Sequence, residues 1–260
     1  MEARVDGKVA LVTGATQGIG HAIAETLARS GVAGLLLTGR DHSRGVLVAK
    51  RISDTGVPAV FVGGDLVEPD MPGRLVKACL ERFGRIDLLA NAAGLTDRAS
   101  LLDGTLDVWA KLFDVNARAP FFLMQGTVKA MLAQGEGGSI VNIQSINAHC
   151  GAPELAIYSA TKAALAVLTR NVANAHRFDR IRVNGINVGW ADTPAERVMQ
   201  AETLGNGSGW IEAANATLPF GRLLAAQEVA NLAVFLLSDA SGPMTGTSID
   251  QDQVVIGASR

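Results

Sequence analysis

The sequence lacks the features that mark secreted, disulfide-bonded or membrane-spanning chains. Among 260 residues there are only two cysteines, Cys79 and Cys150, and a chain of this length can bury a core without a disulfide. No apolar run reaches the roughly 18 residues of a membrane span, and the first residues do not form the apolar segment of a signal peptide. We therefore expect reduced thiols, a cytoplasmic location and no membrane contact.

Charged residues are also scarce, and neither sign dominates. The chain has 23 lysines and arginines against 25 acidic residues, which leaves a net charge of −2. This balance provides no basic field that would attract nucleic acid, so no nucleic-acid partner is predicted. Hydrophobic residues make up 48% of the chain and charged residues 18%, which favours a large buried core. We expect one domain that spans residues 1–260.

Short apolar runs alternate with amphipathic stretches along the chain. The predicted strands are Val9–Thr13, Leu35–Thr38, Ala59–Val62, Ile86–Ala90, Ser139–Ile143, Ile181–Val188 and Ser248–Ile256. The predicted helices between them are Gly18–Ser30, Ser43–Asp54, Pro69–Phe83, Leu106–Ala133, Leu155–Ala175 and Ala226–Ser238. Continuous apolar strands are typical of sheets covered on both faces. The pattern predicts an α/β fold, a Rossmann-type doubly wound parallel sheet of about seven strands with helices on both faces.

Two features depart from a plain alternation. The helical stretches Leu106–Ala133 and Leu155–Ala175 have apolar faces larger than one crossover usually buries, which suits either a subunit contact or packing on the sheet. Residues 190–220 mix prolines, glycines and apolar groups. That segment suits a lid inserted over the substrate, although an ordinary pair of surface helices would have the same composition.

A glycine-rich turn joins the first predicted strand to the first predicted helix. It reads Gly14-Ala15-Thr16-Gln17-Gly18-Ile19-Gly20. Glycines in a strand-turn-helix context let the backbone approach a pyrophosphate, which then lies on the N–H groups at the start of the helix. The turn therefore predicts a dinucleotide site.

The only tyrosine of the chain, Tyr158, stands four residues before Lys162. On a helix this spacing places both side chains on one face, where a lysine ammonium lowers the pKa of a phenol toward neutrality. Ser145 ends a predicted strand upstream, where its hydroxyl can hold a substrate oxygen, and we prefer it to Ser139 and Ser159. The three residues predict acid/base chemistry with Tyr158 as the proton donor and acceptor.

Together these motifs resemble the short-chain dehydrogenase/reductase family. The resemblance rests on Thr13-Gly14-x-x-x-Gly18-Ile19-Gly20, Asn91-Ala92-Ala93-Gly94, Ser145 and Tyr158-x-x-x-Lys162, and it extends from about Gly7 to Gly257. It implies an enzyme that moves a hydride between a nicotinamide cofactor and a carbonyl or secondary alcohol carbon. It also implies a homotetramer.

The resemblance assigns further roles to single residues. Asn116 stands in the middle of a predicted helix, an awkward place for its amide, and by the resemblance it completes the catalytic set by binding a water that links Lys162 to solvent. A surface asparagine is the less favoured alternative. Asp65 contacts the adenine, although a turn that starts a helix explains it too. Asn91 supports the central strand, and Thr193 holds the nicotinamide carboxamide.

The candidate site follows from the motifs and the resemblance, and it includes no metal because the four histidines lack metal-ligand spacing. The catalytic candidates are Ser145, Tyr158, Lys162 and Asn116. The cofactor-binding candidates are Gly14, Thr16, Gln17, Gly18, Ile19, Gly20, Arg40, Asp65, Leu66, Asn91, Ala92, Gly94, Tyr158, Lys162, Val188 and Thr193. Two segments depart from the family pattern: Val188 stands where proline is usual, and Asp250 is followed by Gln251 instead of a glycine pair.

The cofactor prediction depends on the residues after the second predicted strand. Arg40 there can pair with a 2′-phosphate, which favours NADP over NAD. Arg44 adds a second positive charge, but Asp41 has the opposite effect and Arg40 could be an ordinary loop charge, so NAD stays possible.

The substrate prediction is a sugar, a polyol or another hydroxylated small molecule. It rests on the hydrogen-bonding residues expected around the substrate, which are Gln144, Asn147, His149, Thr96, Arg98 and Trp190. Two alternatives stay open: a dinucleotide-sensing regulatory protein without turnover, and a 3-oxoacyl thioester reductase, for which a basic cluster would be expected but is not evident.

Overall fold

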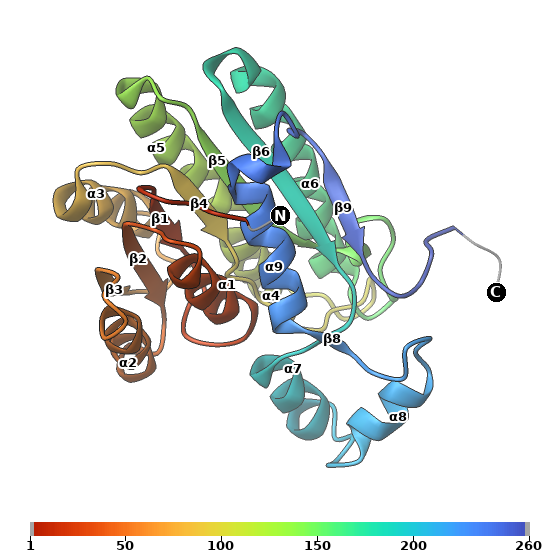
Figure 1. The fold of residues 1–260 in the computed structure, drawn as a ribbon. Helices are drawn as coiled ribbons and strands as arrows, with labels where there is room; N and C mark the ends of the chain where they lie inside the picture. Colours follow the sequence, from red (N-terminus) through yellow and green to blue (C-terminus); the bar gives the residue numbers. More distant parts are fainter. Residues whose placement is uncertain (1–2, 258–260) are drawn as a thin grey trace.

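The computed structural model describes residues 3–257 and has a seven-stranded parallel sheet at its centre (Figure 1). The strand order is β3-β2-β1-β4-β5-β6-β9, so the chain winds outward from β1 in one direction and from β4 in the other. The strands are β1 Val9–Val12, β2 Gly34–Gly39, β3 Ala59–Gly63, β4 Leu88–Asn91, β5 Gly138–Ser145, β6 Ile181–Val188 and β9 Ser248–Gln251. The predicted doubly wound parallel sheet is confirmed.

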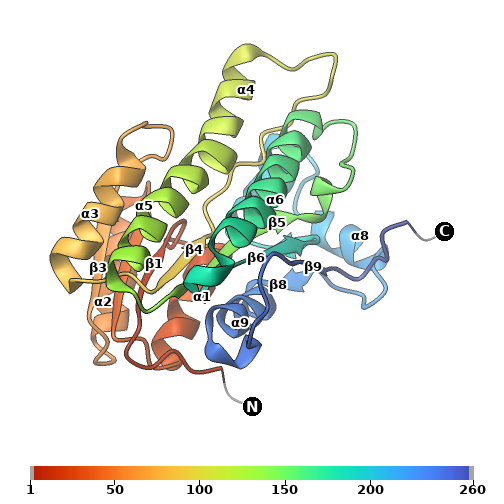
Figure 2. The same ribbon diagram turned by 90° about the horizontal axis from the view of Figure 1, so that it is seen from above.

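Helices cover both faces of this sheet (Figure 2). On one face lie α3 (Met71–Phe83), α4 (Leu106–Phe113), α5 (Ala119–Gln134) and α6 (Ala156–His176). On the other lie α1 (Gly18–Arg29), α2 (His42–Ser53) and α9 (Ala226–Leu237). Successive residues of a strand point to opposite faces, so Leu11 and Leu36 belong to the core under α3 and α5, whereas Val12 and Leu37 belong to the core under α1 and α9. Both faces are therefore buried, as the apolar strands predict.

The prediction of one uninterrupted helix over Leu106–Ala133 is wrong. The structure has α4, then a π-helical turn at Asp114–Arg118, then α5. Within the turn the Ala119 N–H donates to the Asp114 carbonyl, which is an i to i−5 bond. Pro120 explains the break in part, because it has no N–H to donate to the Asn116 carbonyl four residues earlier.

The last strand ends five residues earlier than predicted, at Gln251 instead of Ile256. Beyond it the side chain of Gln253 accepts a hydrogen bond from the Phe220 backbone N–H at 2.9 Å and donates one to the Arg222 carbonyl at 2.6 Å. These bonds turn the chain toward another loop, and Val255 is exposed. Apolar composition alone therefore overestimated the length of this strand.

Residues 190–225 form a small substructure beyond the carboxyl ends of the strands (Figure 1). It contains β7 (Ala191–Asp192), α7 (Pro194–Val198), a π-helical turn (Met199–Thr203), α8 (Trp210–Ala216) and β8 (Leu224–Ala225). β7 and β8 pair in parallel, and Trp210 packs with Ala214 and Leu223 in a separate apolar cluster. This segment has a small core of its own.

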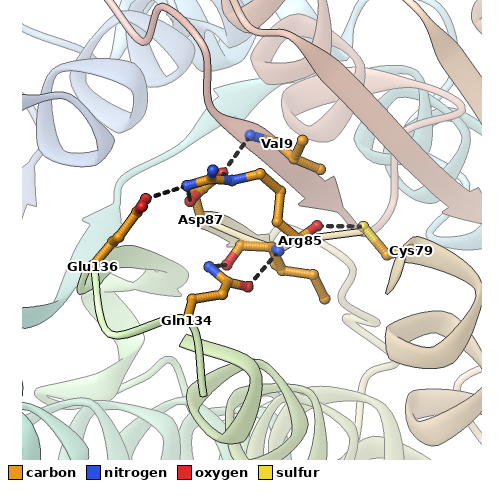
Figure 3. Close-up of polar contacts among 7 residues, drawn as sticks. Val9, Cys79, Arg85, Asp87, Gln134 and Glu136 are labelled. Atoms are coloured by element: carbon orange, nitrogen blue, oxygen red, sulfur yellow. Dashed lines mark hydrogen bonds and ion pairs between the residues drawn. The ribbon is translucent and has the colours of Figure 1, made fainter. Parts of the chain in front are cut away.

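The opposite end of the sheet is held by a polar cluster (Figure 3). Asp87 is 1% exposed and accepts hydrogen bonds from the Val9 backbone N–H at 2.8 Å and from both Nε and Nη2 of Arg85 at 2.9 and 2.7 Å. Arg85 also pairs with Glu136 at 2.5 Å, in the turn before β5. Gln134, at the end of α5, bonds both backbone groups of Ile86. The amino ends of β1, β4 and β5 are thereby tied together away from the candidate site.

Two further predictions concern cysteines and membrane spans. Cys79 is buried and Cys150 is exposed, and neither forms a disulfide, as predicted. Across residues 3–257, no helix has both the length and the apolar character needed to cross a membrane.

Candidate active site

The glycine-rich turn after β1 is closely packed and its glycines are required by geometry. Gly14 has φ +66°, and a Cβ there would come within 2.9 Å of the Ala93 backbone. A Cβ on Gly20 would lie 2.4 Å from the Gly14 carbonyl oxygen, so the start of α1 sits directly against the turn. The turn therefore brings backbone, not side chains, to the edge of the sheet, as a pyrophosphate site requires.

The N–H groups at the start of α1 receive no side-chain cap. α1 begins at Gly18, Gln17 precedes it with no side-chain cap, and the first turn has no acidic residue. Ile19 lies in this turn, and Thr16 is buried against Gly39 at the end of β2. Exposed N–H groups at a helix start carry partial positive charge, so this end of α1 can hold an anion.

Thr13 connects the glycine turn to the strand beside it, a role that the sequence analysis missed. Its Oγ1 accepts hydrogen bonds from the N–H groups of Ala92 and Ala93, both at 3.0 Å. Asn91 donates from Nδ2 to Asn142 Oδ1 at 2.8 Å and thus ties β4 to β5. A threonine that ends a strand just before a glycine-rich turn is the signal that could have shown this connection.

The charged residues after β2 are arranged unequally. Asp41 precedes α2 and its side chain accepts the Arg44 N–H at 2.9 Å, and its carboxylate also pairs with the Arg44 guanidinium at 3.2 Å. Arg44 additionally donates to Gln17 of the glycine turn. Asp41 is thus engaged as a helix cap, whereas Arg40 is exposed. The arrangement leaves positive charge at the place where a 2′-phosphate would lie.

Asp65 and Leu66 follow β3. The Asp65 carboxylate accepts a hydrogen bond from the Val67 N–H at 3.1 Å. This bond is typical of a residue that forms a turn, which was the alternative to a contact with the adenine. Leu66 is 7% exposed and packs in the core, so only its backbone is available to a ligand. The described contacts do not join this pair to the glycine turn.

Tyr158 and Lys162 both lie on α6 and both are buried. Lys162 Nζ lies 5.7 Å from the centre of the Tyr158 ring, and it donates to the Ile143 carbonyl of β5 at 2.9 Å. Ser145 ends β5, and its Oγ accepts hydrogen bonds from the N–H of Asn147 at 3.2 Å and from the Asn147 side chain at 3.3 Å. The fold brings all three predicted catalytic groups to the carboxyl end of β5.

Burial dominates the acid/base properties of the pair. Desolvation raises the pKa of Tyr158 to about 12, opposed by a side-chain hydrogen bond with Ser145. The charge of Glu196 raises the pKa of Tyr158 further, and that of Arg98 lowers it. Burial lowers the pKa of Lys162 to about 8. Without a cofactor the phenol is therefore protonated at neutral pH.

Asn116 is fully buried in the π-helical turn, so the reading as a surface asparagine is wrong. Its Oδ1 accepts the Leu95 N–H at 2.9 Å, while Nδ2 donates to the Leu95 carbonyl at 2.9 Å and to Thr161 at 3.1 Å. Gly94 stands beside it, because a Cβ there would lie 3.4 Å from Lys162 Nζ and 3.5 Å from Asn116 Oδ1. Asn116, Gly94 and Lys162 are thus neighbours.

The end of β6 and the segment after it approach the site from the other side. Val188 is buried in β6 and lies in register with Ser145, so the residue that replaces the usual proline is an ordinary strand residue. Thr193 caps α7 by accepting the Glu196 N–H at 3.2 Å, and a Cβ on Gly18 would lie 3.4 Å from its side chain. This segment therefore touches the glycine turn.

Two of the expected substrate neighbours are engaged elsewhere. Gln144 is 2% exposed and donates to Thr169 of α6 at 2.8 Å, so it belongs to the core. His149 Nε2 lies 2.9 Å from Asp250 Oδ1, which also accepts from Asn187 at 2.7 Å. Strand alternation explains the first error, because Gln144 points to the face opposite to that of its neighbour Ser145.

Comparisons with known proteins agree with this geometry. The family model described as enoyl-(acyl carrier protein) reductase matches residues 14–253. The short-chain dehydrogenase/reductase FrzI of Cladobotryum sp. is 34% identical over 245 residues, which are 94% of this chain and 93% of that protein. L-sorbose reductase from Gluconobacter frateurii, solved with NADPH and L-sorbose, superposes with a TM-score of 0.91 at 29% identity over 100% of both chains. Gluconate 5-dehydrogenase from Burkholderia cenocepacia J2315, solved with NADP and tartrate, gives 0.88 at 31% identity over 99% and 98%.

Proposed function

The chain belongs to the short-chain dehydrogenase/reductase family, and we propose that it is an NADP-dependent oxidoreductase that interconverts a secondary alcohol and a ketone on a hydroxylated small molecule. One observation carries the proposal: Ser145, Tyr158 and Lys162 meet at the carboxyl end of β5, beside the glycine turn. Ligands of open α/β sheets bind at this edge, near the point where the strand order reverses.

The side chains divide the proton chemistry among them. In the oxidative direction the Tyr158 phenolate accepts the hydroxyl proton of the substrate, and in the reductive direction the phenol returns a proton to the carbonyl oxygen. Ser145 donates a hydrogen bond to the same substrate oxygen and stabilises its developing charge. The ammonium of Lys162, held by the Ile143 carbonyl, favours the phenolate. A bound nicotinamide supplies the hydride acceptor or donor.

The environment of the phenol makes the cofactor's charge important. Burial keeps the pKa of Tyr158 near 12 without a ligand, too high for a base at neutral pH. A positive charge placed close to the phenol favours its ionised form. The residues therefore suit a base that becomes active once the oxidised cofactor is bound.

NADP is preferred over NAD in this proposal. Support comes from Arg40, which is exposed after β2, and from Asp41, whose carboxylate is engaged by Arg44 and the start of α2. A carboxylate that accepted from the ribose 2′-hydroxyl would favour NAD. The proteins solved with NADPH or NADP at 29% and 31% identity add to this support, and NAD is proposed as the weaker cofactor.

The substrate class is proposed from the similar proteins and from the polar groups near Ser145. The two solved proteins carry names that refer to a sugar, L-sorbose, and a sugar acid, gluconate. Asn147 contacts the catalytic serine here and offers a hydrogen-bonding amide. We propose sugars, sugar acids and polyols as the first substrates to test.

Three further properties belong to the proposal. Residues 190–220 act as a substrate lid within a single nucleotide-binding domain of residues 1–260, supported by the contact of Thr193 with the glycine turn. The protein forms a homotetramer, supported by exposed apolar side chains on α4 and α5 that include Trp109, Phe121 and Phe122. Its location is cytoplasmic, in keeping with two unpaired cysteines.

The test measures reduced nicotinamide by absorbance with NADP and with NAD over a panel of sugars, sugar acids and polyols. Tyr158→Phe should lower kcat by about a hundredfold or more, because acid/base groups contribute roughly that much, and cofactor should still bind. Ser145→Ala should also be strongly impaired. Ser139→Ala is the matched control on the same strand, since Ser139 donates to the Leu236 carbonyl at the distant end of β5.

Either of two results would count against this function. Full activity of Tyr158→Phe would remove Tyr158 as the acid/base. Cofactor binding without turnover on any alcohol or ketone would favour a dinucleotide-sensing protein instead.

A further inference from the structure

Arg98 carries a positive charge near Tyr158, and within residues 3–257 it has no ion-pair partner. It lies in the loop after β4, and its Nε is buried without a hydrogen-bond partner. Among residues 3–257, no carboxylate forms an ion pair with its guanidinium. Its charge acts on the Tyr158 hydroxyl. A buried polar atom without a partner is costly, and a bound ligand can supply the missing partner.

The neighbours of Arg98 in the chain hold it in place without using its charge. Asp97, the adjacent acid, is already paired with Lys111 of α4 at 2.8 Å. On the other side the Ala99 N–H donates to the Glu154 carbonyl at 2.8 Å, and Ala99 pairs with Leu155 as an isolated β-bridge. Leu155 immediately precedes α6, and Ala99 belongs to the same apolar cluster as Tyr158. The loop is therefore anchored to α4 before Arg98 and to the start of α6 after it.

Resting on the proposed function, we propose that Arg98 binds a carboxylate of the substrate, so that this enzyme acts on hydroxy acids and keto acids in preference to neutral sugars and polyols. A guanidinium offers a rigid fork of donors that matches the two oxygens of a carboxylate. The substrate would place its carboxylate on Arg98 while its reacting hydroxyl lies between Ser145 and Tyr158.

Glu196 is the competing partner for this arginine. Its charge raises the pKa of Tyr158, opposite to the effect of Arg98, and it lies on α7 in the segment proposed as a lid. Its Oε1 already accepts from Trp190 Nε1 at 2.9 Å and from Gln200 Nε2 at 2.7 Å. Oε1 of Glu196 is thus held within its own segment, and among residues 3–257 Glu196 forms no ion pair with Arg98, so the guanidinium stays open to a ligand.

The experiment compares an acid with its matched neutral analogue. For each of gluconate and 4-hydroxycyclohexanecarboxylate, kcat/KM is measured beside that of the corresponding primary amide, with NADP. The wild-type protein should prefer the acid by about tenfold to a hundredfold, the range of a charge-assisted pair. Arg98→Gln should bring this ratio close to one, and Arg98→Lys should retain part of it. Any effect of Arg98 on the pKa of Tyr158 acts on both substrates and cancels in the ratio.

Arg51→Gln is the matched control, because Arg51 is an exposed arginine on α2 and should leave the ratio unchanged. An acid-to-amide ratio near one in the wild type, or the same ratio in wild type and Arg98→Gln, would overturn the assignment of Arg98. If the acid-to-amide ratio fell in Glu196→Gln but not in Arg98→Gln, the acid preference would depend on Glu196 in the proposed lid, and the assignment of Arg98 would be wrong.

A second measurement separates this inference from the proposed function. Calorimetry gives the Kd of each acid and each amide for the protein loaded with NADPH, and it needs no turnover. Tighter binding of the acid that is lost in Arg98→Gln, without turnover, would support the carboxylate site while contradicting the oxidoreductase activity. Turnover of neutral alcohols, with no preference for the acids in Kd or in kcat/KM, would support the oxidoreductase activity and contradict the carboxylate site at Arg98.

Discussion

Asn116 holds both backbone groups of Leu95 with the two ends of one side-chain amide. Oδ1 accepts the Leu95 N–H and Nδ2 donates to the Leu95 carbonyl, both at 2.9 Å. Leu95 directly follows Gly94, whose missing side chain leaves room beside Lys162 Nζ. The asparagine in the π-helical turn therefore shapes the loop that borders Lys162.

Asn116→Ala is expected to lower both stability and turnover. The substitution leaves two backbone groups of Leu95 and the Thr161 hydroxyl without this partner, at a cost of about 2–4 kcal/mol in the free energy of unfolding. Urea denaturation measures the loss, and kcat on the best substrate should fall in the remaining folded protein. Asn174→Ala, on the exposed end of α6, should change the free energy of unfolding by less than about 0.5 kcal/mol. Unchanged stability in Asn116→Ala would contradict the scaffolding role.

Titration of the single tyrosine reports on the active site directly. Burial raises the pKa of Tyr158 to about 12 from an ordinary value of 10.0, so the cofactor-free protein should show little tyrosinate absorbance where a free tyrosine is largely ionised. Because the folded pKa lies above the unfolded value, this group stabilises the fold less as the pH rises from about 10 toward 12. Circular dichroism at each pH therefore confirms that the protein is still folded.

Saturating NADP should shift the tyrosinate signal to lower pH, since a positive nicotinamide beside the phenol favours the anion. The reduced cofactor lacks that charge and is the matched control. A pKa of Tyr158 near 10 without cofactor would contradict the burial of its phenol. The absence of a shift on adding NADP would contradict a nicotinamide site beside it.

Arg40→Asp is expected to reverse the cofactor preference. It removes a positive charge from the end of β2 and introduces a carboxylate that repels a 2′-phosphate. The ratio of kcat/KM for NADP to that for NAD should fall by about tenfold to a hundredfold, the range of one charge-assisted contact. Arg51→Asp applies the same charge change elsewhere on the surface and should leave the ratio as it is. If Arg40→Asp also leaves the ratio of NADP to NAD unchanged, Arg40 does not belong to the phosphate site.

Asp87→Asn tests the polar cluster at the far end of the sheet (Figure 3). The carboxylate accepts three hydrogen bonds and is 1% exposed, so losing its charge beside Arg85 should lower the free energy of unfolding by about 1–3 kcal/mol. KM and kcat should be preserved at temperatures where the variant is folded, because the cluster lies away from Ser145. Asp54→Asn, in an exposed pair with Lys50, should cost less than about 1 kcal/mol. A loss of activity in folded Asp87→Asn would indicate coupling between the two ends of the sheet.

The sequence was sufficient for the seven strands of the central sheet and for the main motifs. Strands buried on both faces need continuous apolar residues, and a turn packed as tightly as Gly14 to Gly20 needs glycine, so both leave a local record. The spacing of Tyr158 and Lys162 is likewise local, because one turn of α6 brings them together.

Other features depended on partners that are distant in the chain. The break in the long helix places Asn116 against Leu95 and Thr161, and only part of its cause, Pro120, can be read locally. The negative charge of Asp41 was taken as evidence against NADP. The structure shows that this carboxylate caps α2, a role that depends on how the backbone folds there. Gln144 was expected near the substrate, yet strand alternation and Thr169 turn it into the core.

The sequence by itself determined the fold class, the glycine-rich turn and the pairing of Tyr158 with Lys162 on one helix, because each depends on residue types repeated or spaced within a short stretch of chain. Only the tertiary structure decided which polar groups are already satisfied and which are left for a ligand. Asp41 and Asp97 are already paired within the protein, whereas Arg40 and Arg98 are available to a ligand. The physical reason is that the charge of a side chain is set by its own chemistry, whereas its availability is set by the groups that the fold packs around it.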